Sequence, residues 1–404
     1  MDVLLRASEL ERQGRSIMRL EVGQPQSGAP AKVVAEAAKA LVEQRLAYTE
    51  ALGILPLRRR ISQHYRDVYG VERLLLLLPQ RPLLLVPQRL LLLLLPPLLL
   101  PPGAFLLAFL AAFDAGDRVA VASASYPCYR NILNALGCKV VTIPINAEYK
   151  VTSKELRAVL DKEDRDRQLG TASHGEGPAS ITPPVKGIIL SSPSNPTGAM
   201  LSGEELAGLS ALCEERGITF ISDEIYHGIC FEGQRAETAL THSRACVVIN
   251  SFSKYFSMTG WRLGWMVVPP AMVDAVNRLA QNLYINAPTL SQASLVAMFL
   301  YCDAQQNLYI NAPTLSQASL LGAVAAFDCE EELEGHIRKY SENRRILLQA
   351  SIAIGRRAYR SCELDAPGLT DMGLTEVAPS DGAFYLYVDT SRAVRDSGAG
   401  SIPV

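Results

Sequence analysis

Short runs of apolar, largely β-branched residues recur along the chain, separated by stretches that are expected to be helical. The expected strands are RVAVA at 118–122, KVVTIPI at 139–145, GIIL at 187–190, ITFIS at 218–222, ACVVIN at 245–250 and GWMVV at 264–268. Apolar strands without polar alternation, separated by helices, are typical of a parallel sheet covered on both faces. The pattern therefore predicts an α/β fold, a three-layer αβα sandwich with a mainly parallel sheet.

Helices are expected around these strands, over residues 103–113, 128–136, 203–216 and 330–352. Ser202 and Glu205 form a capping box at the start of the third helix. A further strand is expected over 382–389. We assign this strand and the long polar helix before it to a smaller, second α+β domain.

Residues 74–100 are anomalous, because they contain 17 leucines and five prolines. The uncharged stretch from Leu90 to Phe113 has the length of a membrane span. Its prolines argue against a spanning helix because they break helical hydrogen bonding. We interpret the block either as a buried but poorly specified segment or as a stretch in which the sequence itself is corrupt, and it indicates no function.

A second anomaly is a repeat, since QNLYINAPTLSQASL occurs at 281–295 and again at 306–320. A solenoid needs roughly three or more repeats to bury a continuous core. We interpret the repeat as a local duplication, with one copy in the native position and the other as an insertion.

The overall composition, 49% hydrophobic and 20% charged residues, is that of a soluble globular chain. The length of 404 residues predicts two or three domains, or one large α/β unit with a smaller companion. Its 39 basic and 41 acidic residues argue against a nucleic-acid-binding protein. The eight cysteines form no C-x-x-C pair, so we expect neither a metal site nor a disulfide framework. Scattered thiols and a start without an apolar core favour a cytoplasmic protein without a signal peptide.

Polar motifs stand at the ends of three expected strands: SNPTG at 194–198, DEIY at 223–226 and SFSK at 251–254. The motif GWRLGW follows at 260–265. Singly, a lysine after a strand is usually a solvated residue, and an aspartate there usually caps a helix. Open α/β sheets bind ligands beyond the carboxyl ends of their strands, so the motifs together indicate an active site there.

In these motifs the chain resembles the fold-type I pyridoxal-phosphate enzymes, and among them the class I/II aminotransferases. The similar segments also include EVGQP at 21–25, AYTEALGILPLR at 47–58 and SYPCY at 125–129. The resemblance implies pyridoxal 5'-phosphate as cofactor, an amino acid and a 2-oxo acid as substrates, and a homodimer with shared active sites. It implies neither a nucleic-acid nor a membrane partner.

The resemblance also divides the chain into three parts. Residues 1–46 are expected to contribute to the small domain, and 47–300 to form the large cofactor-binding domain, with the anomalous block at 74–102. Residues 301–404 are expected to hold the repeated segment and a shortened small domain.

The chemistry of the cofactor supports three catalytic assignments. An imine, or Schiff base, with the cofactor aldehyde needs a primary amine, so Lys254 is the expected attachment residue and proton carrier. A buried carboxylate beside the ring nitrogen keeps that nitrogen protonated, and Asp223 fits this role. By resemblance, Tyr226 hydrogen-bonds the phenolic oxygen of the cofactor.

The remaining binding residues are implied by the resemblance. Those expected at the cofactor ring are Tyr126, which stacks on it, and Asn195, Asp223 and Tyr226. Those expected at the phosphate are Gly103, Ala104, Ser251, Ser253 and Arg262, with Tyr48 reaching over from the neighbouring subunit. Gly23 and Asn195 are expected at the substrate, and no residue is expected to bind a metal.

Other polar residues near the motifs are expected to be structural. We expect Tyr129 in the core, His227 as a structural histidine and Glu224 as a local hydrogen-bonding residue. The run from Arg58 to Arg60 is expected on a solvated helix face.

The chain departs from the family pattern before residue 103. Pro101 and Pro102 stand where the family has a loop of small residues that cradles the phosphate. Prolines lack the N–H groups that such a loop donates, so weakened cofactor binding is expected.

Two further departures concern the C-terminal half. The repeat is expected to displace Asn286 or Asn311 from the neighbouring site. The chain is also expected to end before the arginine that binds the substrate carboxylate, since Arg392 and Arg395 lie too close to the last expected strand.

The predicted function is amino-group transfer from an amino acid to a 2-oxo acid. Because the motifs define the cofactor rather than the reaction, a carbon–sulfur β-lyase and an inactive cofactor-binding relative are alternatives. Aspartate, aromatic and branched-chain amino acids all remain open as substrates.

Overall fold

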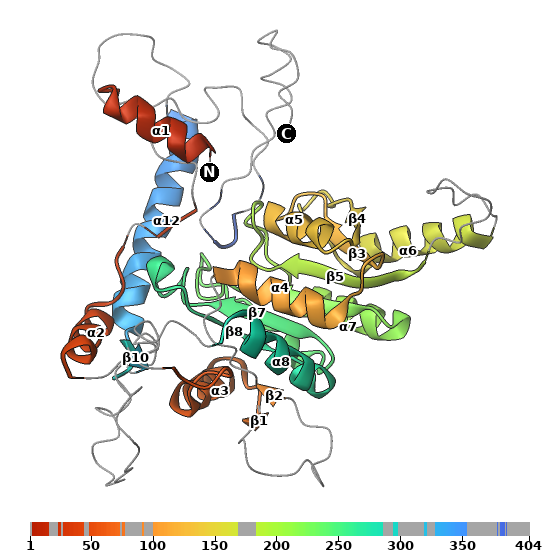
Figure 1. The fold of residues 1–404 in the computed structure, drawn as a ribbon. Coiled ribbons are helices and arrows are strands. Elements are labelled where there is room, and N and C mark those ends of the chain that lie inside the picture. The colour runs from red at the N-terminus through yellow and green to blue at the C-terminus, as the bar shows by residue number, and fades with distance from the viewer. Residues whose placement is uncertain are drawn as a thin grey trace.

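The computed structural model describes residues 2–15, 23–25, 27–43, 48–72, 75–76, 91–92, 100–168, 183–285, 294–297, 319–320, 328–353, 378, 380–383 and 385. At its centre lies a six-stranded sheet in the order β4-β3-β5-β6-β7-β8 (Figure 1). The strands are β3 (Arg118–Ala122), β4 (Lys139–Ile143), β5 (Val185–Ser191), β6 (Thr219–Asp223), β7 (Val247–Ser251) and β8 (Gly264–Val267). All neighbouring pairs are parallel except β7 and β8. The predicted mainly parallel sheet is confirmed.

Helices cover both faces of this sheet, which confirms the three-layer arrangement. One layer consists of α4 (Leu100–Ala112), α5 (Pro127–Ala135) and α8 (Val273–Leu283), and the other of α3 (Leu55–Tyr69), α6 (Ser153–Gln168) and α7 (Gly203–Arg216). Successive side chains of a strand point to opposite faces of the sheet. Accordingly, Val119 and Val121 belong to the apolar cluster under α4, and Ala120 and Ala122 to the cluster under α7.

Local signals in the sequence define the ends of α7. The Glu205 N–H donates to the Ser202 hydroxyl at 3.2 Å, and the Ser202 N–H donates to the Glu205 carboxylate at 2.7 Å. Gly217 ends the helix with a φ of 63°, a left-handed conformation that glycine adopts without steric cost. The predicted capping box is confirmed.

The start of α4 corrects a predicted boundary. The helix begins at Leu100 rather than at Gly103, so Pro101 and Pro102 belong to its first turn. Proline is tolerated there because the N–H groups of the first turn have no acceptor within the helix. Gly103 is buried and Ala104 is half-buried.

The arginine run on α3 corrects a second expectation. Arg58 is 1% exposed and forms an ion pair with Glu50 at 2.9 Å. Arg59 is exposed as expected, and Arg60 pairs with Asp328 at 3.1 Å. Three consecutive arginines have no pattern of polar and apolar positions, so the sequence does not show which of them faces the core.

Further helices lie beside the sandwich: α1 (Asp2–Arg12), α2 (Ala31–Glu43) and α12 (Glu330–Ala353) (Figure 1). α12 confirms the predicted long polar helix and joins the apolar clusters of the sandwich through Leu333 and Ile337. The short elements are β1 (Leu75–Leu76), β2 (Leu91–Leu92), β9 (Ser294–Ala297), β10 (Ser319–Leu320), and the 3₁₀ helices η1 (Ala239–Thr241), η2 (Thr259–Trp261) and η3 (Pro270–Met272).

Several expectations lie outside the described residues. These are most of the leucine-rich block, Asn286, Asn311, Arg392, Arg395, and the strand over 382–389 except for Gly382, Ala383 and Tyr385. Among the helices that the structure describes, none is both long and apolar enough to cross a membrane.

Candidate active site

The register of the sheet brings three of the sequence motifs to one edge. Ser191, at the end of β5, lies opposite Asp223 of β6, and Asp223 lies opposite Ile249 of β7. Ser251 of β7 lies opposite Gly264 in the GWRLGW motif. Because the parallel strands end at the same edge, the residues that follow them converge there.

Asp223 is a buried carboxylate at the end of β6, with 1% of its surface exposed. The Tyr129 hydroxyl donates to its Oδ2, and the Ile225 N–H donates to its Oδ1 at 3.2 Å. Burial raises the pKa of Asp223 to about 7, although these hydrogen bonds and the nearby Lys254 ammonium lower it. A carboxylate in this environment gains stability from a cationic group placed beside it.

Lys254 lies just beyond β7, in the loop that starts at Ser251. Its Nζ donates to the Gly23 carbonyl at 2.6 Å and lies 5.4 Å from the centre of the Tyr226 ring. Burial lowers the pKa of Lys254 to about 8; the Asp223 carboxylate opposes this shift, and the Arg262 guanidinium adds to it. A sizeable fraction of the amine is therefore neutral, and nucleophilic, near neutral pH.

The Arg262 guanidinium is a positive charge close to Lys254. Its Nη1 donates to the Thr259 carbonyl at 2.6 Å, while its Nη2 is buried without a hydrogen-bond partner among the described residues. Burial lowers the pKa of Arg262, and the nearby Tyr126 raises it. A half-buried guanidinium whose Nη2 is buried and unpaired is suited to bind an anion.

Two serine hydroxyls lie on the chain segment that carries Lys254. Ser251 and Ser253 are each 1% exposed. The Ser251 Oγ lies 2.9 Å from both the Ser253 Oγ and the Leu263 carbonyl, and it accepts a hydrogen bond from the Ser253 N–H at 3.0 Å. This network holds the loop after β7 against the residue that follows Arg262.

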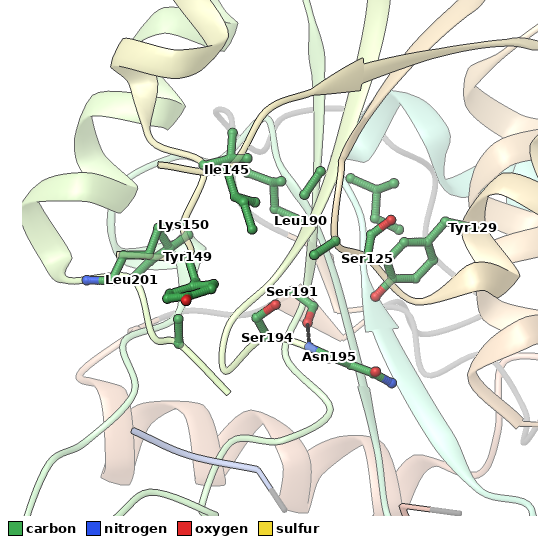
Figure 2. Close-up of a pocket in the computed structure, with 15 residues that line it drawn as sticks. Ser125, Tyr129, Ile145, Tyr149, Lys150, Leu190, Ser191, Ser194, Asn195 and Leu201 are labelled. Carbon is green, nitrogen blue, oxygen red and sulfur yellow. Dashed lines mark hydrogen bonds between the residues drawn. The ribbon is translucent and has the colours of Figure 1, made fainter. Parts of the chain in front are cut away.

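The loop after β5 positions Asn195, whose N–H donates to the Ser191 hydroxyl at 3.0 Å. Figure 2 shows this contact at the edge of a cavity of about 30 Å³ that Tyr129 and Lys150 also line. This volume holds only about one or two water molecules. The cavity therefore adjoins the active site and is too small to be the substrate pocket.

Tyr126 is the N-cap residue of α5 and faces the same edge. Its ring lies 5.6 Å from that of Tyr129, at 89°. Burial, and after it the neighbouring Cys128, Tyr385 and Asp223, raise the pKa of Tyr126 to about 12. The phenol is therefore neutral, and its ring is an aromatic surface close to Asp223.

The structure shows fewer contacts between the site and three other predicted binding residues, Gly103, Ala104 and Tyr48. The first two belong to α4, where the Phe105 ring contacts the Tyr129 ring at 5.0 Å. Tyr48 is 80% exposed, and within the described part of the chain no hydrogen bond or ring contact joins it to the other predicted site residues.

Two tyrosines at the site were not predicted from the sequence. Tyr129 is buried as expected, but its hydroxyl also binds Asp223. Its position three residues after Tyr126 was a signal, because such residues share one helix face. Tyr385 contacts the Tyr226 hydroxyl from 159 residues away, for which the sequence holds no local signal.

Glu224 and His227 make hydrogen bonds of the kind expected of structural residues. The His227 Nδ1 lies 2.8 Å from the Tyr69 hydroxyl. The Glu224 Oε1 accepts hydrogen bonds from local donors, namely the Ser222 hydroxyl at 3.1 Å, the Thr238 hydroxyl at 3.0 Å and the Ala239 N–H at 2.9 Å.

Comparison with known proteins identifies the family of the chain. The sequence profile of the aminotransferase class I and II family matches residues 102–396. The chain belongs to this family. As a member, it is a pyridoxal-phosphate-dependent aminotransferase, which confirms the predicted family, reaction and cofactor. No comparison favours the β-lyase or the inactive relative.

Individual relatives agree with the family match. The aminotransferase is 37% identical over 400 residues to a valine–pyruvate aminotransferase of Mycobacterium tuberculosis, covering 98% of this chain and 82% of the relative. It is 32% identical to a (5-formylfuran-3-yl)methyl phosphate transaminase of Methanocaldococcus jannaschii, covering 74% and 68%. A crystal structure of an aminotransferase from Mycobacterium tuberculosis superposes with a TM-score of 0.71 and 36% identity, covering 97% and 81%.

The residues at the sheet edge fit pyridoxal phosphate. The unpaired Nη2 of Arg262 is an orphaned donor that a phosphate oxygen would satisfy. The buried carboxylate of Asp223 would gain a partner in the protonated ring nitrogen. Lys254 offers the primary amine that the aldehyde requires.

Proposed function

We propose that this aminotransferase attaches its cofactor to Lys254 and moves the amino group of a small aliphatic amino acid, such as valine, to pyruvate. The observation that carries the assignment is the half-buried Lys254 amine, which lies at one sheet edge close enough to the buried Asp223 carboxylate for each charge to shift the pKa of the other group. The substrate class rests on the 37% identity to the valine–pyruvate aminotransferase over nearly the whole chain.

When bound, pyridoxal phosphate supplies an aldehyde that condenses with amines and a protonated ring that withdraws electrons from the substrate α-carbon. Lys254 Nζ, whose pKa is lowered to about 8, would supply the neutral primary amine that holds the aldehyde and would carry the α-proton. Asp223 would hold the proton on the ring nitrogen through charge attraction. The Gly23 carbonyl orients Nζ by accepting its hydrogen bond.

The other predicted site residues bind the phosphate, the ring or the substrate. Arg262, Ser251 and Ser253 hold the phosphate, as do Gly103 and Ala104 at the start of α4. Tyr126 would stack on the ring, and Asn195 and Tyr226 would hydrogen-bond its phenolic oxygen. Gly23 and Asn195 contact the substrate.

We also propose a cytoplasmic homodimer. The exposed side chain of Tyr48 is free to reach a neighbouring subunit, which the resemblance to shared-site enzymes implies. The six cysteines among the described residues are free thiols, as is usual in a reducing compartment.

The assignment of Lys254 is tested by trapping. The full-length protein is incubated with pyridoxal phosphate, reduced with borohydride and mapped by mass spectrometry. We expect the label on Lys254 and its loss in Lys254→Ala, while Lys162→Ala, which changes an exposed lysine of α6, retains it. A label on a different lysine that persists in Lys254→Ala would contradict the assignment.

The reaction is tested with the same preparation, supplied with pyruvate and either valine, aspartate or phenylalanine. We expect alanine and the 2-oxo acid of valine as the main products, without release of ammonia. Faster turnover of aspartate or phenylalanine would contradict the substrate class, and ammonia release would contradict amino-group transfer.

A further inference from the structure

A second tyrosine hydroxyl lies against the hydroxyl of Tyr226. Tyr226 and Tyr385 share a short hydrogen bond in which either oxygen can be the donor. Their ring centres are 5.5 Å apart, with the planes at 75°. The pair joins the end of β6 to a segment near the C-terminus.

The position of Tyr385 is defined by the backbone that precedes it. The Ala383 N–H donates to the Ile229 carbonyl at 2.9 Å, and the Gly382 N–H donates to the Gly198 carbonyl at 3.1 Å. A Cβ on Gly382 would lie 2.5 Å from the Ile229 carbonyl oxygen, so this close approach requires glycine. The segment is therefore tied to the loop that carries Asn195 and to the loop that carries Tyr226.

Tyr385 also packs against the backbone that orients Lys254. A Cβ on Gly23 would lie 2.5 Å from the Tyr385 hydroxyl oxygen, so the ring is in close contact with Gly23. The Gly23 carbonyl, in turn, accepts the hydrogen bond of Lys254 Nζ. Tyr385 thus touches two of the groups that surround the lysine.

The number of hydroxyl hydrogens determines which tyrosine donates in the hydrogen bond between Tyr226 and Tyr385. Burial raises the pKa of both phenols, so each is neutral and has one hydrogen to donate. In the proposed function, Tyr226 donates its hydrogen to the phenolic oxygen of the cofactor. The hydrogen between the two tyrosines then has to come from Tyr385.

We propose that Tyr385 is a positioning residue that donates to Tyr226 and strengthens the hydrogen bond of Tyr226 to the phenolic oxygen of the cofactor. The inference rests on the proposed function, because it needs Tyr226 at that oxygen. Hydrogen bonds in a chain polarise one another, so a donor to Tyr226 makes the Tyr226 hydroxyl a better donor.

The test is a pH titration of the absorbance of the lysine-bound cofactor in parent and Tyr385→Phe, which keeps the ring and removes the hydroxyl. A donor to the phenolic oxygen favours the more negative, deprotonated form, so weakening this donor raises the midpoint. We expect an increase of about 0.2–0.6 pH unit for Tyr385→Phe and of about 1–2 pH units for Tyr226→Phe. The matched control is Tyr255→Phe, which removes a tyrosine hydroxyl that donates to Glu334 at 3.2 Å. This change should leave the midpoint unchanged.

The double variant shows whether Tyr385 acts through Tyr226. If it does, the double variant Tyr226→Phe with Tyr385→Phe has the same midpoint as Tyr226→Phe alone. The reason is that Tyr385 then has no Tyr226 hydroxyl through which to act. Additive shifts, or equal midpoints of Tyr385→Phe and parent, would overturn the inference. Borohydride trapping on Lys254 in the same samples tests the proposed function independently. If the parent shows no trapping, both the proposed function and the inference about Tyr385 are overturned.

Discussion

At the scale of single residues, the reactivity of the site derives from burial more than from residue identity. Lys254 and Asp223 have their pKa values moved toward each other, to about 8 and about 7, because both lose contact with water. The Tyr129 hydroxyl limits the shift of Asp223 by donating to the carboxylate. An amine that titrates near neutral pH is suited to take up and release a proton there.

This environment predicts how cofactor capture depends on pH. Only the neutral amine attacks the aldehyde, so the capture rate of the cofactor-free protein should rise with pH to a midpoint of about 8. Asp223→Asn should lower the midpoint, because the carboxylate raises the pKa of Lys254. Arg262→Gln should raise it, because the guanidinium lowers this pKa. The measurement is the rate of absorbance change on mixing with pyridoxal phosphate at a series of pH values.

Lys150→Gln is a control for the removal of a charge in this protein, because Lys150 pairs with Glu205 and Glu148 rather than with the site residues. Its midpoint should equal that of the parent. Midpoints of Asp223→Asn and Arg262→Gln that move in the same direction would contradict the electrostatic explanation.

At the scale of secondary structure, the start of α4 is the weak point of the site. The N–H groups of a first turn point out of the helix and bind anions, in concert with the helix dipole. Pro101 and Pro102 lie in this first turn and have no N–H to donate. The phosphate contacts that remain are then those of Arg262, the serines of the β7 loop, and Gly103 and Ala104 of α4.

Restoring donors to α4 should therefore tighten cofactor binding. Each hydrogen bond to a charged group contributes about 1.5–3 kcal/mol, so two contribute about 3–6 kcal/mol. Pro101→Ser with Pro102→Ser should lower the Kd for pyridoxal phosphate by roughly two to four powers of ten. Pro269→Ser with Pro270→Ser, at the start of η3, is the matched control, and fluorescence titration measures both. Equal affinities of parent and Pro101/Pro102 variant would show that this turn does not face the phosphate.

At the scale of the whole molecule, the exposed Tyr48 leads to a prediction about assembly. If each site borrows Tyr48 from the partner, a chain with Lys254→Ala and a chain with Tyr48→Ala each form defective homodimers. Their heterodimer has one intact site, with the lysine of one chain and the tyrosine of the other. Refolding equal amounts together should recover about a quarter of the parent activity, since half of the dimers are mixed.

The control is a mixture of Lys254→Ala with Asp223→Asn, two changes within one chain's own site, which should not complement each other. Analytical ultracentrifugation should show a particle of twice the chain mass. A monomer, or a Tyr48→Ala mixture without any recovery, would contradict the shared site.

Local order in the sequence was enough to determine much of this protein. The strand runs, the capping box at Ser202 and the order of the sheet motifs each depend on neighbouring residues, and the structure confirms them. The motifs also determined the family, because the chemistry of the cofactor requires a lysine and a carboxylate after particular strands. A boundary such as the start of α4 was less well determined, since proline is compatible with a loop and with a first helical turn.

Tertiary structure alone decided the properties that depend on distant neighbours. Arg58 is buried because α3 turns that face toward the core, and not because of its sequence context. Tyr385 reaches Tyr226 and Gly23 through backbone contacts between segments that are far apart in the chain. The shifted pKa values of Lys254 and Asp223 have the same origin, because desolvation measures how completely the packed fold excludes water from a group.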